Sequence, residues 1–261
     1  MQRHRARLQH MLGGSILLFL LVVLPLPPSP PVPRTIYLDT FQSPATHVYS
    51  TCYWWESAAD CAGTNGEMEI YLPQQVMTQS DGLHLVAVAQ PYITAKGTTY
   101  AYRSGMITTD GHFTFLYGTV RVRAQVPRGK GLWPAIWLLP QNRASGVELD
   151  LMENLGSDPH TVYQGVHYVG ADGAHQHDGG SYTGPDFSQG FHTFQMDWEP
   201  TRIVWSIDGV VVRTCANPLE IPHTPMFLIA NLAVGGAWPG PPDVTTPFPA
   251  DFIINMLQVQ Q

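Results

Sequence analysis

The sequence predicts an all-β domain built from antiparallel strands, and three observations lead to this prediction. Residues 118–126 alternate between apolar and polar side chains, as expected of a strand with one buried face. Two apolar runs, residues 203–207 and 210–212, are separated by Asp208-Gly209, which is a strong hairpin signal. No segment after residue 33 shows helical periodicity over eleven or more positions. Many strands joined by turns are typical of a β-sandwich or β-barrel.

The other expected strands are short apolar or alternating runs bounded by turn residues. Gly and Pro are plentiful, at 24 and 23 residues, but they follow no short period, which favours turns over disorder. Residues 42–66 are expected to be irregular, and residues 170–184, rich in Gly, His and Asp, are expected to form a long surface loop. Further strands are expected at residues 34–41, 83–89, 102–107, 132–139, 161–168, 191–198, 227–233 and 252–259, and in the acidic stretch 146–156.

The composition excludes one class of partner and favours another. Charged residues make up 13% of the 261 residues, below the ~25% typical of soluble domains, and the net charge is −7. Nucleic acid is not an expected partner, because binding to phosphates needs clustered Lys and Arg. The 7 Trp, 11 Tyr and 10 Phe, together with uncharged polar groups, suit a neutral polymer such as a polysaccharide.

The first 33 residues have the pattern of a secretory signal. Arg3, Arg5 and Arg7 form a basic start, an apolar run follows at residues 16–24, and residues 25–33 are rich in Pro. The run is shorter than the ~20 apolar residues of a membrane span. No Ala-x-Ala cleavage site is evident, so an uncleaved signal anchor with a Pro-rich stalk is the alternative, and only then would the protein be bound to a membrane. In both cases the folded part, residues 34–261, is expected to be secreted or extracytoplasmic.

The chain has three cysteines, Cys52, Cys61 and Cys215, in a compartment that is expected to be oxidising. Cys52 and Cys61 are predicted to form a disulfide that closes a short loop, which leaves Cys215 unpaired. The alternatives pair Cys215 with Cys52 or with Cys61. The spacing of the three residues is not that of a metal site.

Three carboxylates, Glu148, Asp150 and Glu153, lie within six residues and are separated by apolar side chains. In a regular strand Glu148 and Asp150 point to one face, whereas Glu153 points to the other. A β-bulge near Leu151 and Met152 would add one residue and return Glu153 to the face of the other two acids. The sequence therefore predicts such a bulge.

Acids this close together repel one another unless at least one stays protonated, so such a cluster is an uncommon structural feature. Two carboxyl groups with different pKa values are what glycoside hydrolysis requires, one as the acid and the other as nucleophile or base. The alternative interpretation is a solvated acidic strand at a sheet edge.

The chain resembles glycoside hydrolase family 16, the laminarinase-like β-glucanases, from about residue 36 to residue 261. The acid pattern, Glu-x-Asp-x-x-Glu, is the bulged form of the family motif. The other markers occur in the family's order: Tyr-Gly-Thr-Val-Arg-Val-Arg-Ala at 117–124, Gly-Leu-Trp-Pro-Ala-Ile-Trp at 131–137, Gly-Val-His-Tyr at 165–168, Phe-His-Thr-Phe at 191–194 and Asn-Leu-Ala-Val-Gly-Gly at 231–236.

The resemblance implies a concanavalin-like β-jelly roll, a sandwich of two curved antiparallel sheets with a cleft on the concave one. It also implies a secreted retaining endo-glycosidase that hydrolyses β-1,3 or mixed β-1,3/1,4-glucan through a covalent glycosyl-enzyme intermediate. In this scheme Glu148 is the nucleophile, Glu153 is the general acid and then the base, and Asp150 hydrogen-bonds the nucleophile. The partner is then a β-glucan polysaccharide, and a monomer is expected.

Five further residues match positions at the cleft of the family and are expected to bind substrate: Asn65, Trp133, Trp137, His167 and Trp238. Arg103 is a sixth expected substrate-binding residue, although it does not match a family position. Many laminarinases have an arginine where this chain has Met106, and Arg103, three residues earlier, is expected to take its place.

The family commonly holds a structural Ca²⁺, but this chain gives that site no support. The corresponding positions, Thr40 and Asn255, lack the charged oxygens that hard cations prefer. A second metal candidate combines His175 and His177 with His167 or His192, and a solvated loop explains these histidines better. The sequence therefore predicts neither a metal nor a cofactor.

Two other functions share these features. A transglycosylase would use the same residues and pass the glycosyl group to a second sugar instead of water. A non-catalytic glucan-binding module or lectin would keep the fold, but the presence of all three acids favours an enzyme.

Overall fold

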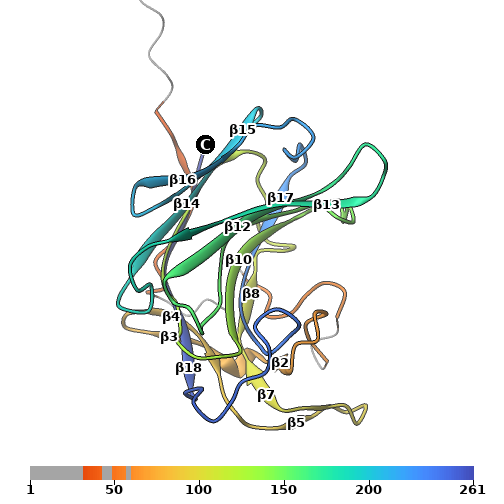
Figure 1. Ribbon diagram of the computed structural model, residues 1–261, viewed down its shortest axis with the longest axis vertical. Coiled ribbons are helices and arrows are strands. Elements are labelled where there is room, and N and C mark those ends of the chain that lie inside the picture. The colour runs from red at the N-terminus through yellow and green to blue at the C-terminus, as the bar shows by residue number, and fades with distance from the viewer. Residues whose placement is uncertain (1–31, 43–48, 57–59) are drawn as a thin grey trace, which may run out of the picture. The chain divides into compact units, whose positions relative to one another are not determined.

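The computed structural model describes residues 32–42, 49–56 and 60–261, and their regular secondary structure is almost wholly β-strand (Figure 1). The predicted signal, residues 1–33, lies almost entirely outside the described residues. Within the described residues, no helix is both long enough and apolar enough to cross a membrane. The single short 3-10 helix of this part, η1, comprises Pro73–Gln75.

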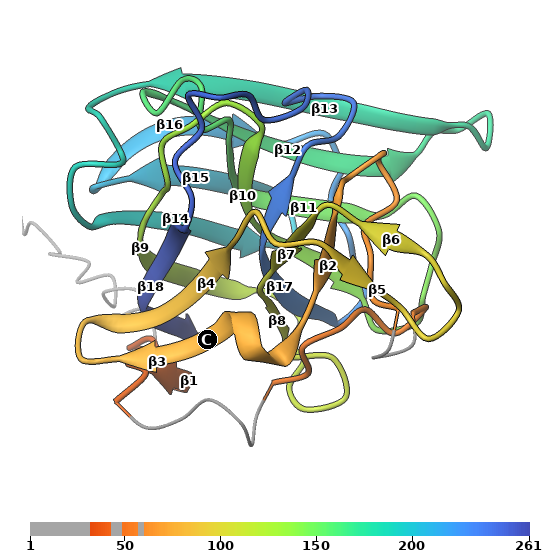
Figure 2. The same ribbon diagram turned by 90° about the horizontal axis from the view of Figure 1, so that it is seen from below.

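The larger sheet has eight strands, and all of its pairings are antiparallel. Its order is β16 (Val210–Cys215), β15 (Arg202–Ile207), β14 (His192–Glu199), β9 (Gly118–Gln125), β18 (Ala250–Gln260), β4 (Gly82–Ala87) and β3 (Val76–Gln79), with β1 (Thr35–Asp39) also paired to β18. Figures 1 and 2 show this sheet from two directions.

The second sheet has six antiparallel strands and carries the acidic stretch on β11. Its order is β13 (His175–Thr183), β12 (Thr161–Val169), β11 (Glu148–Asn154), β10 (Leu132–Pro140), β17 (Met226–Val234) and β8 (Met106–Thr108). Two small pairs complete the described strands: β2 (Glu69–Tyr71) lies parallel to β7 (Tyr102–Ser104), and β5 (Tyr92–Ile93) lies antiparallel to β6 (Thr99–Tyr100). The all-β prediction is confirmed.

The apolar faces of the two sheets pack on each other and form the core. Alternation along β9 buries Val120, Val122 and Ala124, as the sequence predicted. Trp205 links the two sheets directly at the acidic strand, because its buried indole N–H on β15 donates to the carbonyl of Asp150 on β11 at 2.8 Å. The acidic strand is thereby held from the core side.

The Asp208-Gly209 hairpin is confirmed, and both residues have the positive φ angles, 49° and 81°, that a tight hairpin turn requires. The predicted loop at residues 170–184 is wrong. Its greater part is β13, which pairs with β12 along nine consecutive residues at the sheet edge (Figure 2). Most side chains of β13 are exposed, so the strand lacks apolar alternation and is held by its backbone hydrogen bonds.

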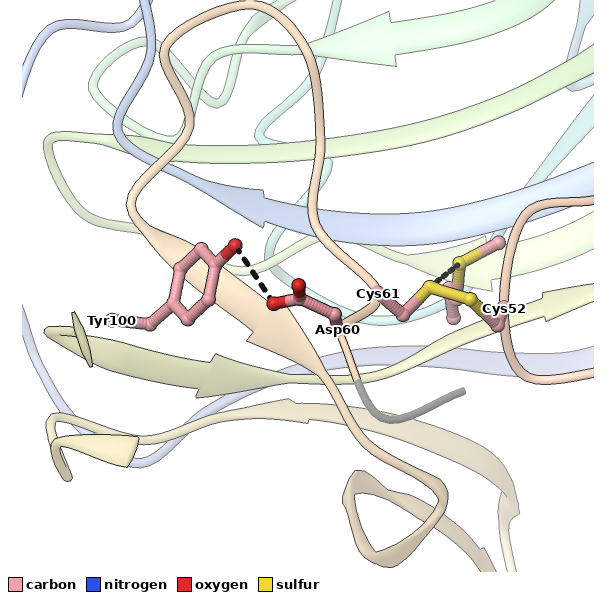
Figure 3. The surroundings of a disulfide bond; sticks show 5 residues. Cys52, Asp60, Cys61 and Tyr100 are labelled. Atoms are coloured by element: carbon pink, nitrogen blue, oxygen red, sulfur yellow. Dashed lines mark hydrogen bonds between the residues drawn. A yellow bond between two sulfur atoms is a disulfide. The ribbon is translucent and has the colours of Figure 1, made fainter. Parts of the chain in front are cut away.

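The structure contains a disulfide between Cys52 and Cys61, with the Cα atoms 5.7 Å apart (Figure 3). Asp60, next to it, accepts hydrogen bonds from Lys96 and from Tyr100. The bridge closes the segment that carries Tyr53, Trp54 and Trp55. Cys215 is a buried free thiol.

We expect Leu149→Ala to lower the free energy of unfolding by about 2–5 kcal/mol, because Leu149 is fully buried on the core face of the acidic strand. The matched control is Leu219→Ala, whose leucine is 61% exposed and whose loss should cost about 0.5 kcal/mol or less. Denaturant unfolding measures both. Equal costs for the two variants would contradict the assignment of residue 149 to the core face.

Candidate active site

The outer face of the six-stranded sheet carries a cleft of about 1240 Å³. Glu148, Asp150 and Glu153 form part of its floor. Its walls come from the disulfide-closed segment with Tyr53, Trp54 and Trp55, from the loop that contains Trp238, and from the edge strand β13. Segments far apart in the sequence therefore surround the three acids.

A β-bulge in β11 places the three acids on one face. Opposite β12, Asp150 pairs with Gly165 and Glu153 with Tyr163, so three steps along β11 match two steps along β12. The register with β10 shifts at the same place. The bulge predicted near residues 151–152 is confirmed, and it returns Glu153 to the cleft face.

The three carboxyl groups differ in their surroundings. Burial, opposed by a hydrogen bond with Asp150 and helped by the nearby Glu153, raises the pKa of Glu148 to about 7. Burial and the nearby Asp150, opposed by a hydrogen bond from Trp133, raise the pKa of Glu153 to about 8. Burial next to Glu148 raises the pKa of Asp150 well above its usual range.

The difference between the pKa values of Glu148 and Glu153 separates the roles that these two groups can take. Glu148 gives up its proton at lower pH than Glu153, so near neutral pH an ionised Glu148 can coexist with a protonated Glu153. Burial next to Glu148 also favours the protonated form of Asp150, which can donate its proton to Glu148. The cluster thus supplies one nucleophile or base and one acid, which is the requirement for cleaving a glycosidic bond.

His167 adjoins two of the acids. Its Nε2 lies 3.8 Å from Glu148 Oε1 and 3.6 Å from Asp150 Oδ2. Burial, together with the neighbouring His177 and His175, lowers its pKa to about 4. His167 is therefore a neutral imidazole at neutral pH, and it brings no positive charge to Glu148.

Tryptophans predicted from the sequence also reach the cleft. Trp133 donates its indole N–H to Glu153 Oε1 at 3.0 Å, so it both lines the cleft and positions the acid. Trp137 donates to Asn231 Oδ1 at 2.8 Å. Trp238 lies edge-on to Trp133 and is 42% exposed, which leaves part of its ring free to contact a ligand.

Asn65 lines the cleft beside the Trp238 loop, and its carbonyl accepts a hydrogen bond from the backbone N–H of Ala237 at 2.9 Å. Arg103 does not line the cleft. Its guanidinium donates to the carbonyl of Pro91 at 2.8 Å and lies over the ring of Tyr92. A spacing of three residues from the family position was not enough to bring this side chain to the site.

Several cleft residues were not singled out from the sequence. Tyr163 lies opposite Glu153 on β12 and packs edge-on against Trp238, and Asn231 bonds Trp137. Asn231 is the first residue of the marker at 231–236, which could have identified it. His175 and His177 were placed in a loop, and only the β12–β13 pairing shows that they border the acids.

Comparisons with known proteins agree with this geometry. The family model described as glycosyl hydrolases family 16 matches residues 51–248. Endo-1,3-1,4-beta-glycanase EglC of Rhizobium meliloti is 36% identical over 214 residues, which cover 75% of this chain and 43% of that protein. Beta-glucanase of Rhodothermus marinus is 30% identical over 218 residues, which cover 75% of this chain and 74% of that protein.

A similar solved structure is the X-ray structure of endo-beta-1,3-glucanase from Pyrococcus furiosus, with a TM-score of 0.77 and 30% identity. The alignment covers 88% of this chain and 94% of the other. The chain spans less than half the length of two Rhizobium meliloti relatives, at 42% and 43%. With the sandwich, the bulged acidic strand and the family match in agreement, the chain belongs to the glycosyl hydrolases of family 16.

Proposed function

We propose that this chain is a secreted, retaining endo-glycosidase that hydrolyses β-1,3 or mixed β-1,3/1,4-glucan. The observation that carries the proposal is the bulge in β11, which aligns Glu148, Asp150 and Glu153 on the floor of an aromatic-walled cleft. The names of the relatives, an endo-1,3-1,4-beta-glycanase, a beta-glucanase and an endo-beta-1,3-glucanase, support a β-glucan as the substrate.

In the first step, the ionised carboxylate of Glu148 attacks the anomeric carbon and forms a glycosyl-enzyme ester. Glu153 gives its proton to the departing glycosidic oxygen, so the bond breaks without releasing an alkoxide. The pKa order suits these roles, because Glu148 ionises at about 7 and Glu153 at about 8. Asp150, protonated beside Glu148, stabilises the carboxylate by donating a hydrogen bond to it.

In the second step, Glu153 is ionised and takes a proton from water, which attacks the anomeric carbon from the side the first sugar left. The ester bond to Glu148 breaks, and Glu153 ends with the proton it had at the start. Two inversions give net retention. Every proton and electron pair is supplied by carboxyl groups and water, so the reaction needs no cofactor.

The walls of the cleft suit a neutral sugar chain. Trp54 and Trp238 both line the cleft with part of their rings exposed, and sugar C–H faces pack on aromatic rings. Asn65 adds polar groups for sugar hydroxyls, and His167 adds a neutral ring beside the nucleophile. We infer binding of an uncharged polysaccharide by a monomer.

We also propose that the enzyme acts outside the cytoplasm. The basic start, apolar run and Pro-rich stretch of residues 1–33 support this location. The Cys52–Cys61 disulfide supports it independently, because such bridges persist in oxidising compartments.

Replacing the acids tests the proposed function. We expect Glu153→Gln to lower kcat on laminarin or lichenan by about 10²–10⁴-fold, and Glu148→Gln to lower it at least as much. Release of reducing ends measures turnover, with agarose and carrageenan as comparison polymers. The matched control is Glu199→Gln on the other sheet, where Glu199 forms an ion pair with Arg202 away from the cleft, and it should keep normal turnover.

Near-normal turnover in either acid variant would overturn the assigned roles. Release of reducing ends from agarose or carrageenan, but not from laminarin or lichenan, would overturn the glucan assignment. Longer oligosaccharides formed without new reducing ends would identify a transglycosylase, and binding of glucan without any reaction would identify a binding module.

The pH dependence of kcat/KM should be bell-shaped, because Glu148 must be ionised and Glu153 protonated in the free enzyme. Activity should rise as the pH passes about 7 and fall as it passes about 8. Trp133→Phe removes an N–H that favours ionised Glu153, so it should raise that pKa and move the falling limb to higher pH.

Trp54→Phe is the control for this shift, because Trp54 lines the same cleft and, among the described residues, donates no hydrogen bond to an acid. It should leave both limbs in place whatever it does to KM. A falling limb that moves equally in both variants, or that moves to lower pH in Trp133→Phe, would contradict the role of the Trp133–Glu153 bond.

A further inference from the structure

A row of potential metal ligands crosses three strands on the floor of the cleft. Glu148 on β11 lies directly opposite His167 on β12, which lies directly opposite His177 on β13. Directly paired residues of antiparallel strands have their Cβ atoms only about 4.5–5.5 Å apart. The rings of His167 and His177 accordingly stack, with their centroids 4.4 Å apart. Two imidazoles in this arrangement can chelate one ion.

Two glycines let His177 reach the acids. A Cβ at Gly165 would lie 2.7 Å from His177 Nε2 and 2.8 Å from Asp150 Oδ2. A Cβ at Gly179 would lie 2.4 Å from His177 Cε1. The imidazole therefore occupies space that any larger residue would fill, and its Nε2 points along the sheet toward Asp150.

Asp150 contributes an unpartnered oxygen at this place. Its side chain is 2% exposed, and Oδ2 has no hydrogen-bond partner among the described residues. Oδ2 lies 3.6 Å from His167 Nε2. Single ligand atoms of Asp150, His167 and His177 all lie within 4.8 Å of one another.

We propose that these three residues bind a divalent transition-metal ion, with Zn²⁺ as the probe, and that the ion inhibits the enzyme. A tetrahedral ion with bonds of about 2.0–2.1 Å places its ligand atoms roughly 3.3 Å apart. Asp150 Oδ2 and His167 Nε2 are already close to this separation. The side chain of His177 is exposed, so it can rotate to bring its ring nitrogen to the same distance from both atoms. The fourth position faces the cleft and takes water.

His175 can fix the tautomer of His167 by accepting a hydrogen bond from it. Its Nε2 lies 3.0 Å from His167 Nδ1, so an N–H on Nδ1 can be donated to His175 while Nε2 keeps its lone pair toward Asp150. Ligating histidines generally donate their second ring N–H in this way. The ligand set differs from the histidine groups considered from the sequence, because Asp150 joins it and His192 does not.

The ion would act on the reaction through Glu148. Bound to His167 Nε2, it attracts the carboxylate of Glu148, whose Oε1 lies 3.8 Å from that nitrogen. A nucleophile held by a cation attacks more slowly. The inhibition rests on the proposed function, whereas the binding of the ion does not.

Calorimetric titration of Zn²⁺ into the chain tests the site. We expect His177→Gln to weaken binding by at least about tenfold. His112→Gln is the matched control, because His112 is exposed, lies outside the cleft lining, and should bind Zn²⁺ as the wild type does. Cys215→Ala controls for a second group, Asp178, Cys215 and Glu220, and should also leave the affinity of the cleft site unchanged.

Unchanged affinity in His177→Gln, or binding that disappears only in Cys215→Ala, would overturn the proposed site. With laminarin as substrate, Zn²⁺ should inhibit the wild type at lower concentrations than it inhibits His177→Gln. Full activity with Zn²⁺ bound would overturn the inhibitory role. If no polysaccharide is cleaved at all, the proposed function fails while calorimetry still decides the metal site.

Discussion

The β-bulge between Asp150 and Glu153 is the constraint on which the rest of the site depends. A regular strand would turn Glu153 into the core, where an acid could neither reach a substrate nor be solvated. With one extra residue, the strand keeps Leu149 and Leu151 buried and still presents three acids to the cleft. Trp205 bonds the carbonyl of Asp150 from the other sheet and so anchors the strand beside the irregularity.

The surroundings that suit the acids to catalysis also oppose their ionisation. Burial raises the pKa values of Glu148 and Glu153 from 4.5 to about 7 and about 8. The folded state therefore holds these protons more tightly than the unfolded chain. Their contribution to stability is present at low pH and is lost as the pH rises from about 4.5 through about 8. One cause, burial, thus keeps the catalytic acid protonated and reduces stability in alkaline solution.

Much of the fold and the centre of the site were predictable from the sequence, because alternation, an Asp-Gly turn and the acid spacing are local signals. Strand β13 was missed because it lies at the sheet edge with mostly exposed side chains, so its sequence has no alternation of apolar and polar residues. Tyr163 and His177 join the site only through cross-strand pairing, which the sequence does not state. Arg103 was misplaced because its neighbour Pro91 and the ring of Tyr92 hold its side chain outside the cleft.

The bulge should set the carboxyl groups of Glu148 and Glu153 at the short separation of a double displacement, about 5–5.5 Å, rather than the wider one that admits a water. A proton NMR time course of laminarin hydrolysis tests this most directly, because it identifies the anomer formed before mutarotation. The β-anomer of the new reducing end should appear first, and the α-anomer should follow slowly. Initial formation of the α-anomer would exclude a double displacement by Glu148 and Glu153.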